Sequence, residues 1–282
     1  MKNLLKISAG FILLAAAIAS CDKKDTLPAT YNTGTAPALS TSSLTSTPVD
    51  SSSAVTTISW TSPAYDRFSD ANVIYIVQID SAGKNFSNPQ TITTFTGGLS
   101  KAIVAKDVNN ALLNGKSYPA TVPVDMEIRI LASKPNYDEQ HSSNSVKLHY
   151  IPYIPAMPAV AAAPVTTMPV NNELYMVGDM TPGGWNNPVP VPSQKLTKVG
   201  NIYSVTLRSN GTGQYLLLPV NGDWGHKYAI QDPATSPALQ GYFGYNSGNA
   251  YNSNFNGPSR PGLYLYRYDV AKGYYYIVLV GY

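Results

Sequence analysis

The sequence predicts an all-β protein with two antiparallel β-sandwich domains joined by a proline-rich spacer. Three observations support this. The length of 282 residues suits two domains, each with its own core. Short runs of alternating apolar residues recur between turn residues, which is typical of sandwiches. Residues 151–170 interrupt the pattern with prolines, which fix φ and remove hydrogen-bond donors.

The first domain is predicted over residues 37–150. Its expected strands are short alternating runs at 55–60, 73–79, 91–95, 126–130 and 146–150. A single helical turn is predicted from Asp107 to Leu113, with Asp107 as its N-cap. Trp60 lies on an alternating strand, so we expect it in the core.

The second domain is predicted over residues 171–282, after an extended spacer at 151–170. It holds 14 of the 21 tyrosines, together with Trp185 and Trp224. Its expected strands are 173–177, 202–207, 214–219, 263–269 and 274–280. The last two form a hairpin in which Gly273 supplies a positive φ.

The N-terminus reads as an export signal. Lys2 and Lys6 precede a short apolar run from Ile7 to Ala19, which ends in small residues before Cys21, the only cysteine. This run is shorter than the ~20 residues that a membrane-spanning helix needs. The segment resembles a lipoprotein signal peptide over residues 1–20. We therefore expect Cys21 to carry lipid, followed by a flexible tether over residues 21–36.

The composition favours a neutral partner. Charged residues make up only 12% of the chain, about half the globular average. Loss of Lys2 and Lys6 with the signal leaves 17 basic residues of the original 19, against 16 acidic ones. The sequence has no basic stripe, so we expect no nucleic-acid partner.

The two distal tryptophans lie in turns. Trp185 follows two glycines and precedes two asparagines, and Trp224 lies between Asp223 and Gly225. Loops on a rigid sandwich are where binding residues gather. Either indole can serve as a flat platform for a ligand or pack into the core, and the sequence leaves both possibilities open.

The second domain opens with residues 173–186, Glu-Leu-Tyr-Met-Val-Gly-Asp-Met-Thr-Pro-Gly-Gly-Trp-Asn. This stretch is similar to the starch-binding modules of the SusE and SusF outer-membrane lipoproteins of Bacteroidetes, and Pro261 to Tyr264 also fit. Trp60 stands where fibronectin type III and other Ig-like sandwiches carry a core tryptophan. A lipoprotein signal, an Ig-like domain and a carbohydrate-binding module in this order resemble SusE, although the chain has room for one binding module only.

The resemblance implies a glucan site made of an aromatic pair, a basic residue and an asparagine. Carried onto this sequence, it nominates Trp185, Trp224, Lys227, Tyr228 and Asn221.

Residues 241–262 interleave aromatic residues with Asn, Ser and Gly, as adaptable binding surfaces do. Tyr242 and Arg260 are further candidates from this segment. The alternative is an irregular connection whose aromatic rings cap the edge of the sandwich.

No catalytic, cofactor or metal site is predicted. The three histidines, His141, His149 and His226, lack metal-ligand spacing, and no Gly-x-Ser-x-Gly motif occurs. A glycosidase would need a pair of carboxylates. The distal aspartates are better explained as turn or cap residues, namely Asp179, Asp223, Asp232 and Asp269.

These features together predict a non-catalytic lipoprotein at the cell surface that binds starch or a malto-oligosaccharide. It would be lipid-anchored in the outer membrane, facing outward, beside an importer and other surface lipoproteins. The alternative is a structural or protein-interaction subunit of a surface complex. A third possibility, an accessory domain of a lost hydrolase, predicts the same sugar affinity.

Overall fold

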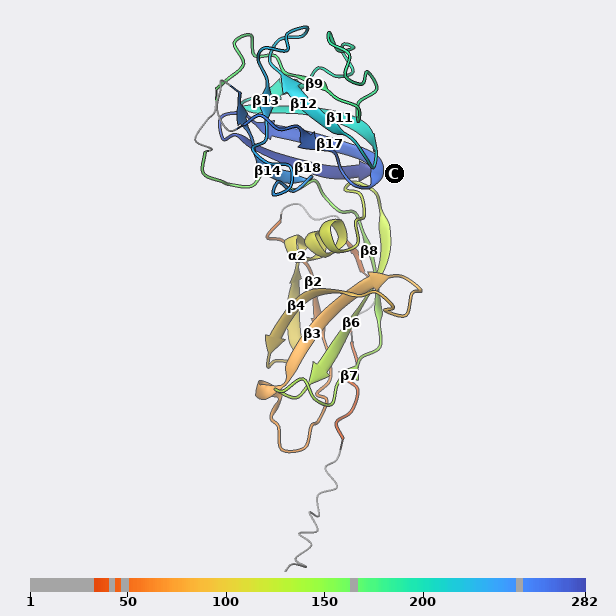
Figure 1. Ribbon diagram of the computed structural model, residues 1–282. Helices are drawn as coiled ribbons and strands as arrows, with labels where there is room; N and C mark the ends of the chain where they lie inside the picture. Colours follow the sequence, from red (N-terminus) through yellow and green to blue (C-terminus); the bar gives the residue numbers. More distant parts are fainter. Residues whose placement is uncertain (1–32, 41–43, 47–50, 163–166, 247–250) are drawn as a thin grey trace, which may run out of the picture. The chain divides into compact units, whose positions relative to one another are not determined.

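The computed structural model describes residues 33–40, 44–46, 51–162, 167–246 and 251–282 (Figure 1). The predicted signal peptide, Cys21 and most of the predicted tether lie outside these residues. The predicted all-β class is confirmed, since strands dominate and almost all of their pairings are antiparallel. Among the described residues, no helix has the length and apolar character needed to cross a membrane.

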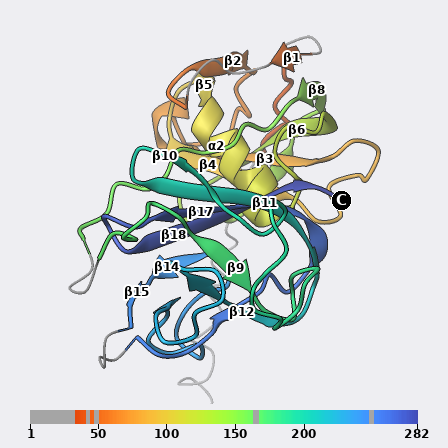
Figure 2. The same cartoon turned by 90° about the horizontal axis from the view of Figure 1, so that it is seen from above.

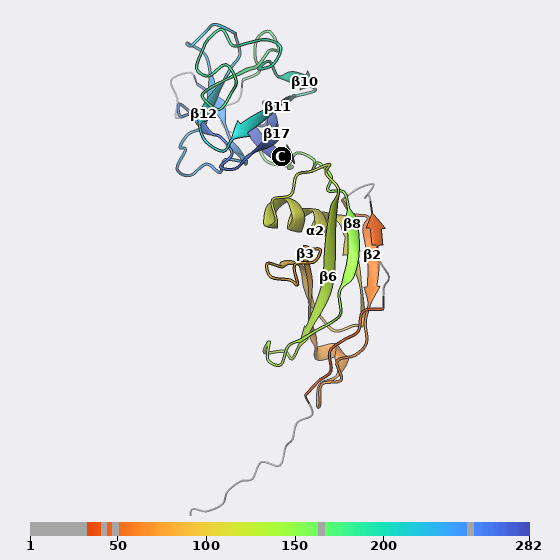
Figure 3. The ribbon, with the colours of Figure 1, turned by 90° about the vertical axis from the view of Figure 1, so that its right-hand side faces the viewer.

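The first sandwich contains all five predicted strands and three more. Its larger sheet has the order β1-β8-β6-β3-β4, with β7 beside β6, and its smaller sheet pairs β2 with β5. In Figure 3, β2 lies in a layer apart from β3 and β6. The bounds are β1 Leu44–Ser46, β2 Ala54–Ser59, β3 Ile74–Ser81, β4 Gln90–Thr96, β5 Ser100–Val104, β6 Val124–Ser133, β7 His141–Ser142 and β8 Val146–Tyr150.

One pairing departs from the predicted antiparallel pattern. Strand β1 runs parallel to β8, with Leu44 opposite Leu148 and Ser46 opposite Tyr150. Strands β1 and β8 are far apart in the sequence, so no tight turn forces them to be antiparallel.

The predicted helical turn exists, but its N-cap was wrong. The short 3-10 helix η1 spans Asp70–Asn72, and α2 spans Ala105–Asn110 and continues into the π-helical turn η2, Ala111–Gly115. The N-cap of α2 is Val104, whose side chain makes no capping bond. The helix starts directly from the end of β5, so Asp107 falls inside its first turn. There its negative charge interacts favourably with the helix dipole.

The core of this sandwich is centred on aromatic residues. The prediction for Trp60 is confirmed, because its ring is buried and packs 5.1 Å from Tyr75 and 5.9 Å from Phe95. Both rings come from strands of the opposite sheet, so the indole joins the two layers.

The distal sandwich also has two sheets. One has the order β10-β11-β17-β18-β14; the other has the order β15-β13-β12-β16, with β9 beside β12. Figure 2 shows β11, β17 and β18 side by side, with β9, β12 and β15 to one side of them. The bounds are β9 Tyr175–Val177, β10 Thr197–Val199, β11 Ile202–Asn210, β12 Gln214–Leu218, β13 Tyr228–Ala229, β14 Gln240–Tyr242, β15 Gly244–Tyr245, β16 Phe255–Asn256, β17 Pro261–Asp269 and β18 Tyr274–Gly281.

All five distal strands predicted from the sequence are present, and the hairpin between β17 and β18 is confirmed. Asp269 pairs with Tyr274 across the turn, and Gly273 has φ +59°. That backbone conformation favours glycine, which explains the residue at this position.

The two sandwiches have separate hydrophobic cores. One core draws on residues 39–150 and the other on residues 174–277. The predicted domains at 37–150 and 171–282 enclose these two cores. The described part of the predicted spacer, 151–162 and 167–170, contains no strand and almost no regular structure.

A buried ion pair stabilises the first sandwich. Asp80, near the end of β3, accepts hydrogen bonds from Lys116 Nζ, from Asn88 N at 3.0 Å and from Ser81 N at 2.7 Å. Both side chains of the ion pair are almost fully buried. Burial alone would raise the pKa of Asp80, but the bonds from Lys116, Asn88 and Ser81 lower it overall.

We expect Asp80→Asn to reduce the free energy of unfolding by about 3–5 kcal/mol at pH 7, because it leaves the Lys116 ammonium buried without its counter-charge. The folded-state pKa of Asp80 lies below the unfolded value of about 3.9. The stabilisation is therefore present above about pH 4 and is lost as the pH falls through the folded-state pKa.

Urea unfolding of both proteins from pH 7 down to pH 3 measures this difference. Asp125→Asn is the matched control, since that carboxylate is exposed and pairs with His149 on the surface. An Asp80→Asn cost as small as that of Asp125→Asn would contradict the role given to the buried pair.

Candidate functional site

Both distal tryptophans present their rings to solvent. Trp185 is 38% exposed and Trp224 is 48% exposed. Most large apolar side chains of this domain are buried, so these indoles are exceptions. Of the two possibilities left open by the sequence, core or surface, the structure therefore favours the surface for both.

The Trp185 turn is closed by its own backbone. Gly178 N donates to Gly184 O at 3.0 Å, and Thr181 N donates to Gly178 O at 2.9 Å. The buried side chain of Gln194 supports the turn from below, since its Oε1 accepts from Gly183 N at 2.7 Å and its Nε2 donates to Met176 O at 2.7 Å. The motif Gly-Asp-Met-Thr-Pro-Gly-Gly therefore forms a rigid base for the indole.

The Trp224 turn is organised by the aspartate that precedes it. Asp223 Oδ1 accepts from Gly225 N at 2.6 Å, and Asp223 Oδ2 lies 2.6 Å from His226 Nδ1. The bond with His226, followed by that from Gly225 N, lowers the pKa of Asp223. The carboxylate therefore stays ionised at neutral pH and holds both flanks of the indole.

Two asparagines join the tryptophan-bearing loops. Gly222 N donates to Asn187 Oδ1 at 2.7 Å. Val189 N donates to Asn221 Oδ1 at 2.7 Å, and Asn221 Nδ2 donates to Val189 O at 3.2 Å. We call these three bonds the asparagine clasp. The clasp places the segment that follows Trp185 against the segment that precedes Trp224.

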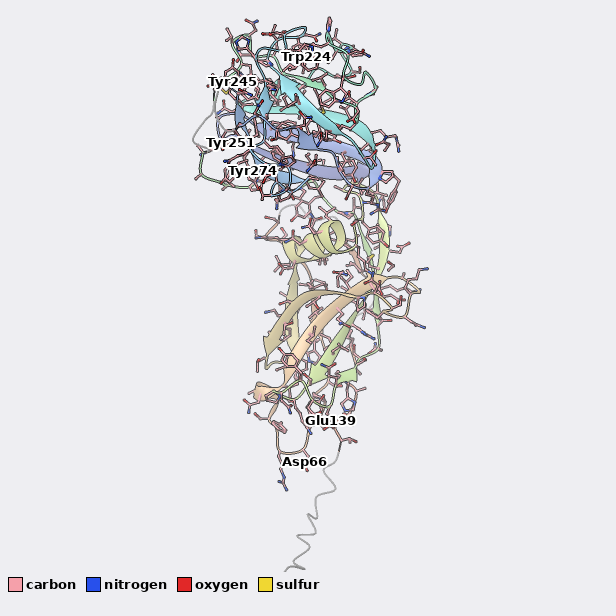
Figure 4. All side chains as sticks on the ribbon, viewed as in Figure 1. Asp66, Glu139, Trp224, Tyr245, Tyr251 and Tyr274 are labelled. Carbon is pink, nitrogen blue, oxygen red and sulfur yellow. The ribbon has the colours of Figure 1, made fainter. Side chains whose placement is uncertain are left out.

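His226 and Tyr245 extend this surface, and the sequence analysis did not select either. Their rings are stacked 6.2 Å apart at an interplanar angle of 15°. Asn246 N donates to Lys227 O at 2.8 Å and so holds the Tyr245 strand beside the Trp224 turn. Figure 4 shows Trp224 and Tyr245 toward the same end of the distal sandwich. The sequence did offer one indication of this extension, since Tyr245 lies inside the aromatic segment 241–262.

Two predicted ligand contacts have other roles in the structure. Tyr228 is only 1% exposed, its ring packs against Phe243 and Tyr245, and its hydroxyl donates to Thr167 O. The prediction that Tyr228 contacts the ligand is wrong, because β13 turns this side chain into the core. Its burial also raises the pKa of the Tyr228 hydroxyl. Asn221 uses both atoms of its carboxamide on Val189, so it supports the loops.

The remaining predicted ligand contacts, Lys227, Tyr242 and Arg260, do not lie together on one surface. Lys227 is half-buried in the Trp224 turn. Tyr242 is exposed on β14, an edge of the other sheet, and packs against Tyr274 at 5.1 Å. Arg260 lies 5.6 Å from the Tyr282 ring, and its carbonyl accepts from the Tyr264 hydroxyl. The structure thus places Lys227 in the Trp224 turn and joins that turn to the Trp185 loop through the asparagine clasp. It gives Tyr242 and Arg260 separate neighbours.

Three of the four distal aspartates bond within their own turns, as predicted, whereas Asp179 bonds the start of a distant strand, β12. Apart from Asp223, Asp179 accepts from Gln214 N at 2.5 Å, Asp232 from Ala234 N at 2.9 Å and Asp269 from Lys272 N at 3.1 Å. Within the described ranges, no group of three or more His, Cys, Asp or Glu side chains is placed to hold a metal.

Comparison with known proteins identifies a relationship for the first part of the chain. The model of the SusE outer membrane protein family matches residues 24–131, which is less than half of the chain. Over those residues the predicted SusE-like character is confirmed. The match ends within β6, so Trp185 and Trp224 lie beyond it. The search of curated proteins found no match.

Two solved structures are among those that resemble the chain. SusF from Bacteroides thetaiotaomicron is 16% identical with a TM-score of 0.32, and the similarity covers 86% of this chain and 51% of SusF. The chain therefore spans about half the length of SusF. The FN1–FN3 domains of chicken CNTN1 are 12% identical with a TM-score of 0.23, covering 88% of this chain and 69% of that one.

The contrast in burial between Tyr228 and Trp224 predicts unequal effects of their substitution on stability. We expect Tyr228→Ala to reduce the free energy of unfolding by about 3–5 kcal/mol, because it empties a packed aromatic position. Trp224→Ala should change it by no more than about 0.5 kcal/mol, because the ring is half in solvent. Thermal and urea unfolding measure both. Equal losses in the two variants would contradict the placement of Trp224 at the surface.

Proposed function

We propose that this protein is a non-catalytic cell-surface lipoprotein that binds a neutral glucan, with starch or a malto-oligosaccharide as the ligand. One observation carries the proposal: two exposed indoles lie on loops that the asparagine clasp joins. Trp185 and Trp224 are the principal contacts. Lys227, His226 and Tyr245 border them.

The chemistry of sugars fits this surface. A pyranose ring has a face of C–H groups and an edge of hydroxyls. A rigid indole covers the face with a large apolar area, at little cost in side-chain entropy. The hydroxyls need neutral or singly charged partners at the rim. Lys227 and His226 lie in the same turn as Trp224 and supply such groups.

The charge of the molecule supports a neutral ligand as well. Only 12% of the residues are charged, and the basic and acidic residues nearly balance once the signal is removed. Such a surface gives no long-range attraction for a polyanion. Uncharged polysaccharide remains a compatible partner, bound by stacking and by neutral hydrogen bonds.

The N-terminus and the family match support the proposed location. The sequence of residues 1–21 resembles a lipoprotein signal, and the matching family is one of outer membrane proteins. We place the protein at the outer membrane, anchored through lipid on Cys21 and facing the cell exterior. There it would hold polysaccharide beside an importer and other surface lipoproteins.

An interaction subunit without sugar binding is the second candidate. The observation that favours it is the apolar character of the same loops, where Val191 is 57% exposed and Val220 is 41% exposed. Contiguous exposed apolar side chains are typical of protein interfaces. In that case the tryptophans would pack against a protein partner.

Isothermal titration of the mature protein with maltoheptaose tests the first candidate. We expect measurable, weak binding, and at least a tenfold loss of affinity in Trp224→Ala, equal to about 1.4 kcal/mol. Tyr137→Ala is the control, since it removes an exposed aromatic ring from the first sandwich.

The outcomes separate the two candidates. Absence of heat with several glucans, combined with capture of a surface protein that Trp224→Ala fails to capture, would favour the interaction subunit. Glucan binding that survives in both Trp224→Ala and Trp185→Ala would contradict the proposed site.

A further inference from the structure

The pairing of strands does not by itself bring the two indoles together. Trp185 lies in the loop that follows β9, and Trp224 lies in the loop that follows β12. These strands are antiparallel neighbours, with Val177 opposite Leu216 and Tyr175 opposite Leu218. Their C-terminal loops therefore leave the pair at opposite ends. Some other interaction must join the loops.

The asparagine clasp is that interaction. Asn187 lies two residues after Trp185, and Gly222 lies two residues before Trp224, so the bond from Gly222 N to Asn187 Oδ1 links points close to each indole. Gly222 has φ +98°, and glycine adopts this conformation without strain. Asn221 adds a pair of bonds to Val189: its Oδ1 accepts from Val189 N and its Nδ2 donates to Val189 O, as two paired strand residues would do.

We propose that Asn187 and Asn221 are positioning residues, which lock the two indole loops into one platform and make binding depend on glucan length. This inference rests on the proposed function. A glucan that reaches both fixed indoles gains a second contact without a second loss of translational freedom. A short sugar that covers one indole gains nothing from the clasp.

The asparagines act through the indoles, so their effect should differ from that of a contact residue. Loss of the clasp lets the two loops move independently, which adds an ordering cost when a long glucan binds both. The affinity for a short glucan, which needs one indole only, should remain unchanged.

Titration of the mature protein with maltotriose and maltoheptaose tests this. We expect Asn187→Ala and Asn221→Ala to lower the affinity for maltoheptaose about tenfold and to leave that for maltotriose unchanged. Asn187→Asp keeps an acceptor for Gly222 N, so it should retain the wild-type dependence on length. Asn186→Ala is the matched control, because Asn186 Nδ2 bonds Gly183 O within its own loop.

Folding is checked by near-ultraviolet circular dichroism and thermal unfolding. Asn187→Leu and Asn221→Leu, which keep the size of the side chain but cannot accept these bonds, replace any alanine variant that does not fold. A folded Asn187→Ala protein that keeps the wild-type preference for maltoheptaose would overturn the proposal. Equal losses for both sugars would overturn it too, since they indicate a direct contact.

Acrylamide quenching of tryptophan fluorescence separates this inference from the proposed function. If the wild-type protein binds no glucan, the proposed function fails, while the clasp is still testable. Greater quenching in Asn187→Ala than in wild type and Asn186→Ala would support the clasp. Unchanged quenching would refute it.

Discussion

The hydroxyl groups of buried tyrosines constrain the whole distal sandwich. A buried phenol is costly unless its hydroxyl finds a partner, and most buried tyrosines of this domain have one, Tyr203 being an exception. Tyr215 and Tyr268 bond each other at 2.8 Å, and burial raises the pKa of both. Others reach out of the core to loop carbonyls, as Tyr275 does to Pro237 O at 2.6 Å and Tyr264 does to Arg260 O at 2.9 Å.

These bonds explain how loops stay fixed on a domain without a cysteine. The only cysteine lies at position 21, so a disulfide cannot staple this domain. Tyr228, Tyr264 and Tyr275 instead fill the core with their rings and tie a connection with their hydroxyls. The tyrosine enrichment of the C-terminal part therefore has a structural cause. Trp185 and Trp224, by contrast, are exposed, as are Tyr242 and Tyr282.

The sequence predicted the regular elements well because their signals are local. Alternation gave the long strands, and Gly273 gave the final hairpin. Elements that depend on distant partners were missed, such as the parallel strand β1 and the short strands β13 to β16. The N-cap at Asp107 was wrong because the helix continues directly from β5, which only the tertiary structure decides.

The same distinction applies to the candidate site. Trp185 and Trp224 could be nominated from the sequence because an aromatic ring among glycines and polar residues is visible there, and both are exposed. Tyr228 was misassigned, since it lies in the same polar run yet begins a strand. The role of Asn221 was also hidden, because its partner Val189 is 32 residues away. The ring of His226 became relevant only when the fold stacked it on Tyr245.

The family match and the exposed indoles lie in different domains of the molecule. The match covers residues 24–131, in the first sandwich, whereas the exposed indoles lie in the distal one. A sandwich tolerates changes in its loops as long as its core is kept, so loop residues can diverge while the scaffold stays recognisable. The distal turns around Trp185 and Trp224 are held by bonds between loops rather than by strand pairing. Their geometry can therefore change independently of the domain that carries the family match.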